Sequence, residues 1–337
     1  MPRSLFRTAA ADAFRACCII AATAVATSVA TIAFAHAGAF PERPIKLVVP
    51  YTPGGSTDQF GRALAEGMSR ELKQTVVVEN RPGANTMVGT QSVARAPADG
   101  YTMIMASSAS MVLNPMLYKR TGYDPKDFKV FLIGTEVPLV IVTNNQVPAS
   151  GTRDFASYAK AAGGKLNYSS VGLGNPLQLA TEMLKTELGI ELTHVPYNGS
   201  APALSALLAN DVQLMVDVVS TSLPHIRAGK LKALAVTSRT RLEVLPNVPT
   251  MAESGYPDFH AATWFGLAVP AHTPPDVVTR LQSAASQVLG DAQFRATFAA
   301  LGLVVQSPRT QAEIDRYVAT DRETWGKVIR ANRISLD

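Results

Sequence analysis

Apolar and polar positions alternate along the chain in blocks that predict strands followed by helices. Residues 45–50 (IKLVVP) form an apolar run typical of a buried strand, and residues 56–72 repeat apolar side chains four positions apart, as one face of a helix does. Strand-like runs at 75–78 and 101–106 enclose a helical segment at 88–96. Such repeated strand–helix–strand units predict an α/β fold with mainly parallel sheets flanked by helices.

A second set of these units begins near Leu139 and ends before a proline-rich stretch at 246–257. An apolar strand-like run at 264–269 follows, and beyond it only helical patterns and one short run at 303–306 remain. Because so few strands follow it, we interpret the 264–269 run as the strand that completes the first sheet.

The predicted architecture is therefore two lobes joined by a hinge of two crossover segments. A domain usually has roughly 100–200 residues, and this chain has 337. The expected crossings lie near 138–144 and 258–264, and two crossings form a hinge with a cleft. Two serial domains divided near residue 138 are the alternative. The expected segments are 38–138 with 264–337 for lobe 1, and 139–263 for lobe 2.

The first 37 residues have the parts of an export signal. Residues 1–15 hold three arginines and one acid, residues 17–34 form a small-apolar run, and residues 35–37 (AHA) match the pattern that signal peptidase reads. We predict cleavage after Ala37, with Ala35 as the alternative, and a periplasmic product. A retained anchor is the competing interpretation, because the run approaches the roughly 17–25 residues of a membrane span.

Composition and spacing argue against several kinds of site. The net charge of +5 is mild and the basic residues are scattered, so nucleic-acid binding is not expected. Both cysteines, Cys17 and Cys18, precede the predicted cleavage point, which leaves no thiol for a disulfide, a nucleophile or a metal. The histidines lack metal-pair spacing. We expect neither a cofactor nor a metal.

Glycine and hydroxyl residues cluster directly after several predicted strands. In open parallel sheets, ligands bind beyond the carboxyl ends of the strands. Most of these loops lead into helices, whose uncapped N–H groups attract anions, although each loop alone is more often a plain turn or cap. Their convergence predicts a site for a small organic anion, and facing helix starts suit a dicarboxylate. The candidate ligand-binding residues are Gly54, Gly55, Ser56, Thr57, Asp58, Ser107, Ser170, Gly174, Asn175, Tyr197, Asn198, Gly199 and Asp217.

The same loops carry a family resemblance that extends over essentially the whole mature chain. The chain resembles the receptors of tripartite tricarboxylate transporters, the Bug or TctC family, in segments 40–45 (FPERPI), 53–58 (PGGSTD), 78–84 (VENRPGA), 194–197 (HVPY) and 199–203 (GSAPA). The resemblance implies a periplasmic receptor, expected to be a monomer, that binds a carboxylate between two α/β lobes and delivers it to membrane transporter subunits.

The resemblance also implies roles for individual residues. It assigns one carboxylate to the first loop, at Gly54, Gly55, Ser56, Thr57 and Asp58, and second-lobe roles to Ser170, Gly174, Tyr197, Gly199 and Asp217. Replacing Gly55 by valine is expected to block the first loop, both by bulk and by restricting its backbone.

Three positions depart from the family pattern. Asn198 stands where lysine is frequent, Gln178 follows the Gly174 turn in a changed segment, and Val218 begins a segment where Asn-Leu-Pro is common. These changes predict a more apolar pocket. We therefore hypothesise a bulky or aromatic carboxylate, such as a phthalate-type diacid.

Catalysis has little support in the sequence. Ser157 and Lys160 match Ser-x-x-Lys but lack its companion motifs. A periplasmic hydrolase or lyase would have to use Asp58 or Asp217, and we expect no enzyme. The other alternative is a sensor subunit that presents its closed form to a membrane kinase, because transport and sensing use the same closure.

Overall fold

The structure is a computed structural model that describes residues 40–197 and 199–336. The predicted export signal, its cleavage site and Asn198 lie outside the described residues. The fold below is that of the second of two units, which begins at Arg43. Within the described part of the chain, no helix combines the length and apolarity needed to cross a membrane.

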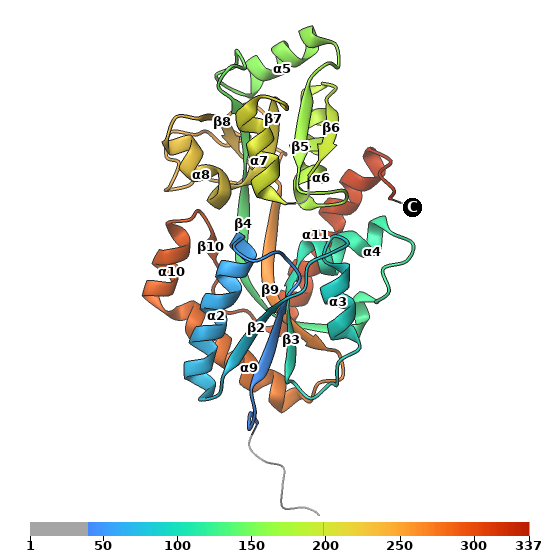
Figure 1. The fold of residues 1–337 in the computed structure, drawn as a ribbon, viewed down its shortest axis with the longest axis vertical. Coiled ribbons are helices and arrows are strands. Elements are labelled where there is room, and N and C mark those ends of the chain that lie inside the picture. Colours follow the sequence, from blue (N-terminus) through green and yellow to red (C-terminus); the bar gives the residue numbers. More distant parts are fainter. Residues whose placement is uncertain (1–39, 198, 337) are drawn as a thin grey trace, which may run out of the picture. The chain divides into compact units, whose positions relative to one another are not determined.

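A mixed sheet runs through the second unit in the order β2-β1-β3-β9-β4-β7-β5-β6, and β8 and β10 also pair with β4 (Figure 1). The strands are β1 (Ile45–Val49), β2 (Val76–Asn80), β3 (Thr102–Ser107), β4 (Phe128–Asn144), β5 (Asn167–Ser170), β6 (Thr193–Pro196), β7 (Leu214–Val218), β8 (Leu231–Val236), β9 (Ala262–Pro270) and β10 (Val304–Val305).

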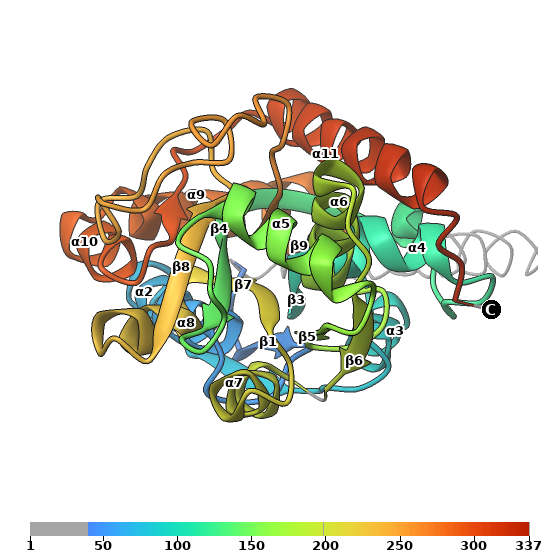
Figure 2. The ribbon, with the colours of Figure 1, turned by 90° about the horizontal axis from the view of Figure 1, so that it is seen from above.

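Helices flank these strands on both sides (Figure 2). They are α2 (Ser56–Leu72), α3 (Met87–Ala94), the π-helix η1 (Ala109–Leu113), α4 (Asn114–Leu117), the 3-10 helix η2 (Pro125–Asp127), α5 (Thr152–Ala162), α6 (Pro176–Leu188), α7 (Ser200–Ala209), α8 (Val219–Arg227), α9 (Pro275–Gly290), α10 (Ala292–Ala299) and α11 (Gln311–Ala331).

The strands form two lobes that share the long strand β4, which confirms the predicted two-lobed α/β architecture with two crossover segments. Strand β4 pairs with β9 as far as Pro138, and from Leu139 onward it pairs with β7 and β8. The prediction of mainly parallel sheets needs correction. Pairing is parallel among β1, β2 and β3 and among β5, β6 and β7, but every ladder of the crossover strands β4 and β9 is antiparallel. The exact lobe limits remain a prediction.

Helix α2 shows how the sequence pattern becomes packing. Its apolar side chains, spaced four apart, are all buried: Phe60, Leu64 and Met68 have no exposed surface and Leu72 has 4%. Gly67 lies on the same helix where α9 passes closely, since a Cβ atom at this position would come within 2.5 Å of the Val288 side chain. The predicted amphipathic helix is thus confirmed, and its glycine permits the close approach of α9.

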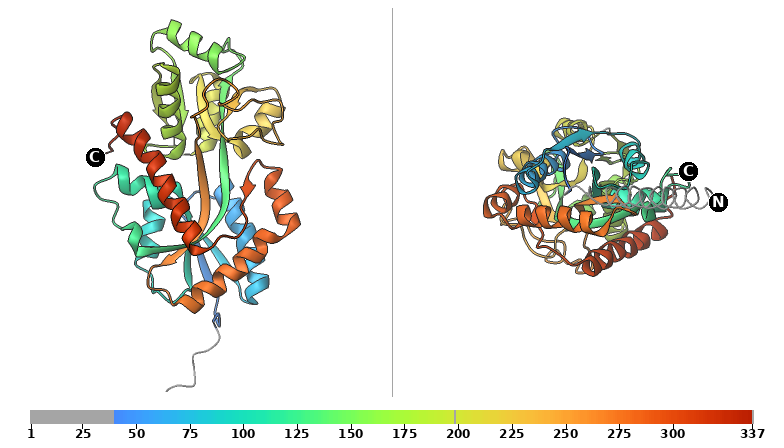
Figure 3. Two further views of the ribbon diagram at one scale, coloured as in Figure 1. Left: turned by 180° about the vertical axis from the view of Figure 1, so that it is seen from behind. Right: turned by 90° about the horizontal axis from the view of Figure 1, so that it is seen from below.

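The last helix, α11, lies against the hinge on the side opposite α7 (Figure 2). Seen from behind, α11 crosses the two crossover strands and reaches from one lobe to the other (Figure 3). At its end the Thr186 hydroxyl of α6 donates to the Asn332 side chain at 2.8 Å. The hinge therefore has two distinct sides, one facing the strand–helix loops and one covered by α11.

Candidate functional site

The strand register brings the carboxyl ends of both groups of parallel strands toward the hinge. Ser107, the last residue of β3, pairs with Phe265 of β9, which faces Thr135 of β4. Asp217, near the end of β7, faces Val140, which also belongs to β4. These two levels lie about 17 Å apart along β4, at roughly 3.3 Å per residue. The loops after both groups of strands therefore border one region between the lobes, where a site at strand ends is expected.

The carboxylate of Asp58 holds the loop between β1 and α2. Its Oδ2 accepts hydrogen bonds from the Gly54 N–H and the Arg62 Nε, both at 2.9 Å, and its Oδ1 accepts from Asn80 Nδ2 at 2.8 Å. The Asn80 amide also donates to the Tyr51 carbonyl at 3.1 Å. Burial acts to raise the pKa of Asp58, but these hydrogen bonds and the Arg62 charge outweigh it and lower the pKa. Both oxygens are thus occupied within lobe 1.

Helix α2 begins without a side-chain cap. Its N-cap residue is Gly55, so the first-turn N–H groups, including those of Ser56 and Thr57, have neither an intrahelical acceptor nor a side-chain cap. The expectation that glycine is needed at position 55 for backbone freedom is wrong: at φ −74° and ψ 168° it is extended, which any residue adopts. Gly54, at φ +88°, is the position that favours glycine.

Ser107 joins the first loop to the end of β3. Its buried hydroxyl lies 2.8 Å from the Tyr51 hydroxyl, and its N–H donates to Ser110 Oγ at 3.0 Å. Burial raises the pKa of Tyr51 to about 12, which the Ser107 hydrogen bond only partly offsets, so the phenol stays protonated at neutral pH. The Tyr51 ring meets Phe265 edge-on, with centroids 6.4 Å apart. Tyr51 was not predicted, although it lies inside the glycine-rich segment.

Ser170 fixes the loop that follows β5. Its hydroxyl accepts from the Gly172 N–H at 3.3 Å and lies 2.6 Å from His194 Nε2, while the Tyr197 N–H donates to its carbonyl at 3.0 Å. Burial lowers the pKa of His194, and the ring stacks on Tyr168. The buried Ser170 side chain therefore joins the β5 and β6 loops, and its geometry is that of a turn rather than of an exposed nucleophile.

Helix α6 is capped by its own side chains. Asn175 Oδ1 accepts from the Leu177 N–H at 3.0 Å, and Gln178 Oε1 accepts from the Gly174 N–H at 2.6 Å. Both side chains are buried, at 6% and 7% exposure. The predicted ligand residue Asn175 thus serves as a cap, and the departure at Gln178 closes its own turn.

Helix α7 begins as α2 does, without a side-chain cap. Its N-cap residue is Gly199, at φ +112°, and a Cβ atom there would have no neighbour within 4 Å. Tyr197 lies half-buried just before it. The second lobe therefore presents an open helix start beside an aromatic side chain.

Asp217 is fully buried at the end of β7. Its Oδ2 accepts from the hydroxyls of Thr221 at 2.5 Å and Ser222 at 2.7 Å, and its Oδ1 has no hydrogen-bond partner. Burial raises the pKa of Asp217 to about 6, against the effect of those hydrogen bonds. The structure encloses this carboxylate behind the first turn of α8, and sequence reasoning missed the two hydroxyls that hold it.

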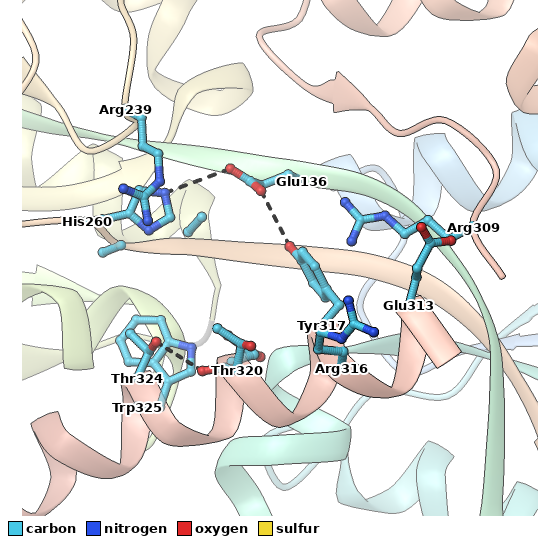
Figure 4. A pocket seen from close by; sticks show the side chains of 13 residues that line it. Glu136, Arg239, His260, Arg309, Glu313, Arg316, Tyr317, Thr320, Thr324 and Trp325 are labelled. Carbon is cyan, nitrogen blue, oxygen red and sulfur yellow. Dashed lines mark hydrogen bonds and ion pairs between the residues drawn. The ribbon is translucent and has the colours of Figure 1, made fainter. Parts of the chain in front are cut away.

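A separate cavity of about 440 Å³ lies on the α11 side of the hinge, and none of the predicted ligand residues lines it (Figure 4). We call it the hinge cavity; its charged lining is formed by Glu136, Arg239, His260, Arg309, Glu313, Arg316 and Asp321. Across the described ranges, no three potential ligand side chains are grouped so as to hold a metal ion.

The model of the tripartite tricarboxylate transporter family receptor, TctC, matches residues 60–334. The chain belongs to this receptor family. Among its relatives, a protein of Pseudomonas sp. (strain P51) named for the tcbD–tcbE intergenic region is 36% identical over 95% of both chains. Protein BugT of Bordetella pertussis is 35% identical over 89% of this chain and 92% of its own.

Solved structures of similar receptors share the fold. An R. palustris protein solved with adipate is 34% identical, with a TM-score of 0.83 over 88% of this chain and 99% of its own. The periplasmic binding protein BugD is 36% identical, with a TM-score of 0.80 over 88% and 99%. MatC from Rhodopseudomonas palustris, solved with bound malate, is 31% identical, with a TM-score of 0.79 over 86% and 100%. The receptor's family and structural relatives are thus periplasmic solute-binding proteins.

Proposed function

We propose that this receptor acts in the periplasm, holds a small organic carboxylate between its lobes and delivers it to a tripartite tricarboxylate-type membrane transporter. Family membership supports the receptor role. The adipate and malate in two related structures support a carboxylate, and both molecules are dicarboxylates.

The observation that carries the proposal is the pair of helix starts without side-chain caps, α2 at Gly55 and α7 at Gly199. First-turn N–H groups and the helix dipole together attract anions, so a carboxylate at each start would supply the missing acceptor. Asp58 cannot fill this role for α2, because both its oxygens are occupied. One start in each lobe matches a ligand with two acidic ends, which would favour the closed state by bridging the lobes.

We further propose that the acid is bulky or aromatic. The Tyr51 and Phe265 rings lie beside Ser107, and Asn198 lacks the charge of the lysine that is frequent there in related receptors. The departures at Gln178 and Val218 do not support a bulky ligand, because both residues are buried, with 7% exposure each.

Calorimetric titration with adipate, malate, citrate, phthalate and terephthalate tests the proposal. A diacid is expected to bind, and Gly55→Val is expected to lower its affinity about 100-fold or more, because the branched side chain would stand over N–H groups that each donate to a charged acceptor. The fold should tolerate the change, since the Gly55 backbone is extended and a Cβ atom there meets only the Thr52 carbonyl, at 3.9 Å.

The matched control is Gly151→Val. Gly151 is also an extended, uncapped N-cap glycine, but it starts α5 at the far end of the second lobe (Figure 1). Its variant should bind like the wild type. Unchanged affinity in Gly55→Val, or no binding of any of these acids, contradicts the proposed site. Binding of citrate or malate alone contradicts the aromatic ligand and leaves the receptor role standing.

A further inference from the structure

The hinge cavity has the size and position of a second ligand site. Its volume of about 440 Å³ lies within the roughly 300–1,000 Å³ usual for small-molecule sites. Its walls come from β4, which provides Glu136, from the segment between β8 and β9, which provides Arg239 and His260, and from α11, which provides Tyr317 and Asp321. Side chains of α11 line it (Figure 4), and α11 lies on the side of the crossover strands opposite α7 (Figure 2).

Two carboxylates, those of Glu136 and Asp321, face this cavity without an ion pair to an arginine or a lysine. Glu136 has 27% of its side chain exposed; it accepts a long hydrogen bond of 3.4 Å from the Tyr317 hydroxyl, and His260 Nε2 lies 3.9 Å away. Asp321 Oδ2 accepts from Trp264 Nε1 at 2.8 Å. Among the described residues no arginine or lysine forms an ion pair with either acid.

Protonation of His260 does not provide a cation for these two acids at neutral pH. Burial lowers the pKa of His260, an effect that the nearby Arg239 adds to and Glu136 opposes, so the imidazole does not neutralise Glu136. Burial raises the pKa of Asp321 to about 6, partly offset by the Trp264 hydrogen bond and increased by the Glu136 charge. At pH 7.5 the carboxyl group of Asp321 is therefore mainly ionised.

Three arginines stand at the same cavity without pairing with those acids. Arg239 lies with His260 on one side of Glu136, and Arg309 lies on the other (Figure 4). Arg309 donates to Gln306 Oε1 at 2.7 Å and stacks on the Tyr317 ring at 4.6 Å. Arg316 is exposed on α11, next to Tyr317 in the sequence. The fold thus places arginines and carboxylates on the walls of one cavity without pairing them.

This separation of charge selects the kind of ligand. A simple anion would meet Glu136 and Asp321, and a simple cation would meet the three arginines, so each would gain contacts on one side and repulsion on the other. We propose that the hinge cavity binds a small zwitterion of the α-amino-acid class, with its ammonium group between Glu136 and Asp321 and its carboxylate against the arginines. The Tyr317 and Trp325 rings line the same space and would cover an apolar side chain.

This site is independent of the proposed carboxylate site, and the experiment keeps them apart. The α-amino acids are titrated singly into the wild type and into Gly55→Val at pH 7.5. At least one amino acid is expected to bind equally to both proteins, while its N-acetyl derivative and its methyl ester bind about tenfold more weakly or worse, because each lacks one charge.

Variants of the cavity test its residues. Glu136→Gln and Arg316→Ala are each expected to lower amino-acid affinity about tenfold, the loss of one charge-assisted hydrogen bond. Arg322→Ala is the matched control, because Arg322 is an exposed arginine of the same helix that lies outside the hinge cavity. It should bind like the wild type, and thermal unfolding should show all variants folded. Because Arg316 is exposed, its variant keeps the test valid even if Glu136→Gln does not fold.

Three outcomes would overturn the proposal. The first is that no amino acid binds to either protein. The second is binding that survives both Glu136→Gln and Arg316→Ala, which would place the ligand elsewhere. The third is binding that disappears in Gly55→Val, which would assign the amino acid to the site between the lobes.

Discussion

Each lobe holds a buried aspartate where a parallel strand gives way to a helix, and the two are held in opposite ways. Asp58 accepts hydrogen bonds from Gly54, Arg62 and Asn80, and its pKa is lowered. Asp217 accepts two hydroxyl hydrogen bonds on one oxygen and none on the other, and burial raises its pKa to about 6. At the same kind of junction, Asp58 thus fixes a loop, whereas Asp217 is a buried carboxylate without a cationic partner.

The largest expected effect on stability comes from Asp58→Ala. The change removes the acceptor of three donors at once, so we expect the free energy of unfolding to fall by about 3 kcal/mol. The β1–α2 loop should also lose its shape, which would weaken diacid binding at the α2 start. Urea unfolding followed by circular dichroism measures the first effect, and calorimetry the second.

Asp58→Asn sharpens this test. Asparagine keeps one oxygen acceptor but removes the charge that pairs with Arg62. The free energy of unfolding of Asp58→Asn should therefore lie between that of the wild type and that of Asp58→Ala. If both variants unfold like the wild type while diacid binding disappears, Asp58 touches the ligand and does not hold the loop.

Local patterns predicted local features well. The spacing of apolar side chains four apart predicts the buried face of α2, and glycines predict the helix starts. Neither prediction needs knowledge of distant partners. The partner of Asp58 could not be found this way, because Asn80 lies 22 residues further along the chain and reaches it through the pairing of β1 with β2. The first half of β4 was missed because Gly134 and Pro138 interrupt its apolar run.

The hinge cavity was harder still to foresee. Glu136, His260 and Asp321 belong to three distant segments, and none of them has a neighbour in the sequence that indicates a site. Only the crossing of β4, β9 and α11 brings them together, and tertiary packing of that kind leaves no periodic signal.

The second largest expected effect is a pH-dependent change in the free energy of unfolding that arises from Asp217. Its pKa is 3.8 as a free side chain and about 6 in the fold, so the fold favours the protonated form. That stabilisation is complete below about pH 4 and is lost as the pH rises through 6. Asp217→Asn keeps an acceptor for Thr221 and Ser222 without the charge. Relative to the wild type, it should therefore gain about 2 kcal/mol in unfolding free energy between pH 4 and pH 8, at about 1.4 kcal/mol per pKa unit.

Urea unfolding of both proteins at the two pH values measures this difference. If the difference in unfolding free energy stays constant with pH, the fold does not raise the pKa of Asp217. Its carboxylate would then be stabilised as well as that of Asp58, and the contrast between the two aspartates would disappear.

The smallest expected effect separates capped from open helix starts. Asn175 caps α6, whereas α2 and α7 begin at glycines without a cap. Asn175→Ala should therefore lower the free energy of unfolding by about 1 kcal/mol, the usual contribution of a cap, and leave diacid affinity within twofold of the wild type.

Thr310→Ala is the matched control for this change, because Thr310 caps α11 away from the strand–helix loops and should show a similar loss of stability. Asn175 was predicted to bind the ligand, so the two measurements decide its role. A clear loss of diacid affinity in Asn175→Ala, absent in Thr310→Ala, would return Asn175 to the binding site and make α6 a third helix start in contact with the anion.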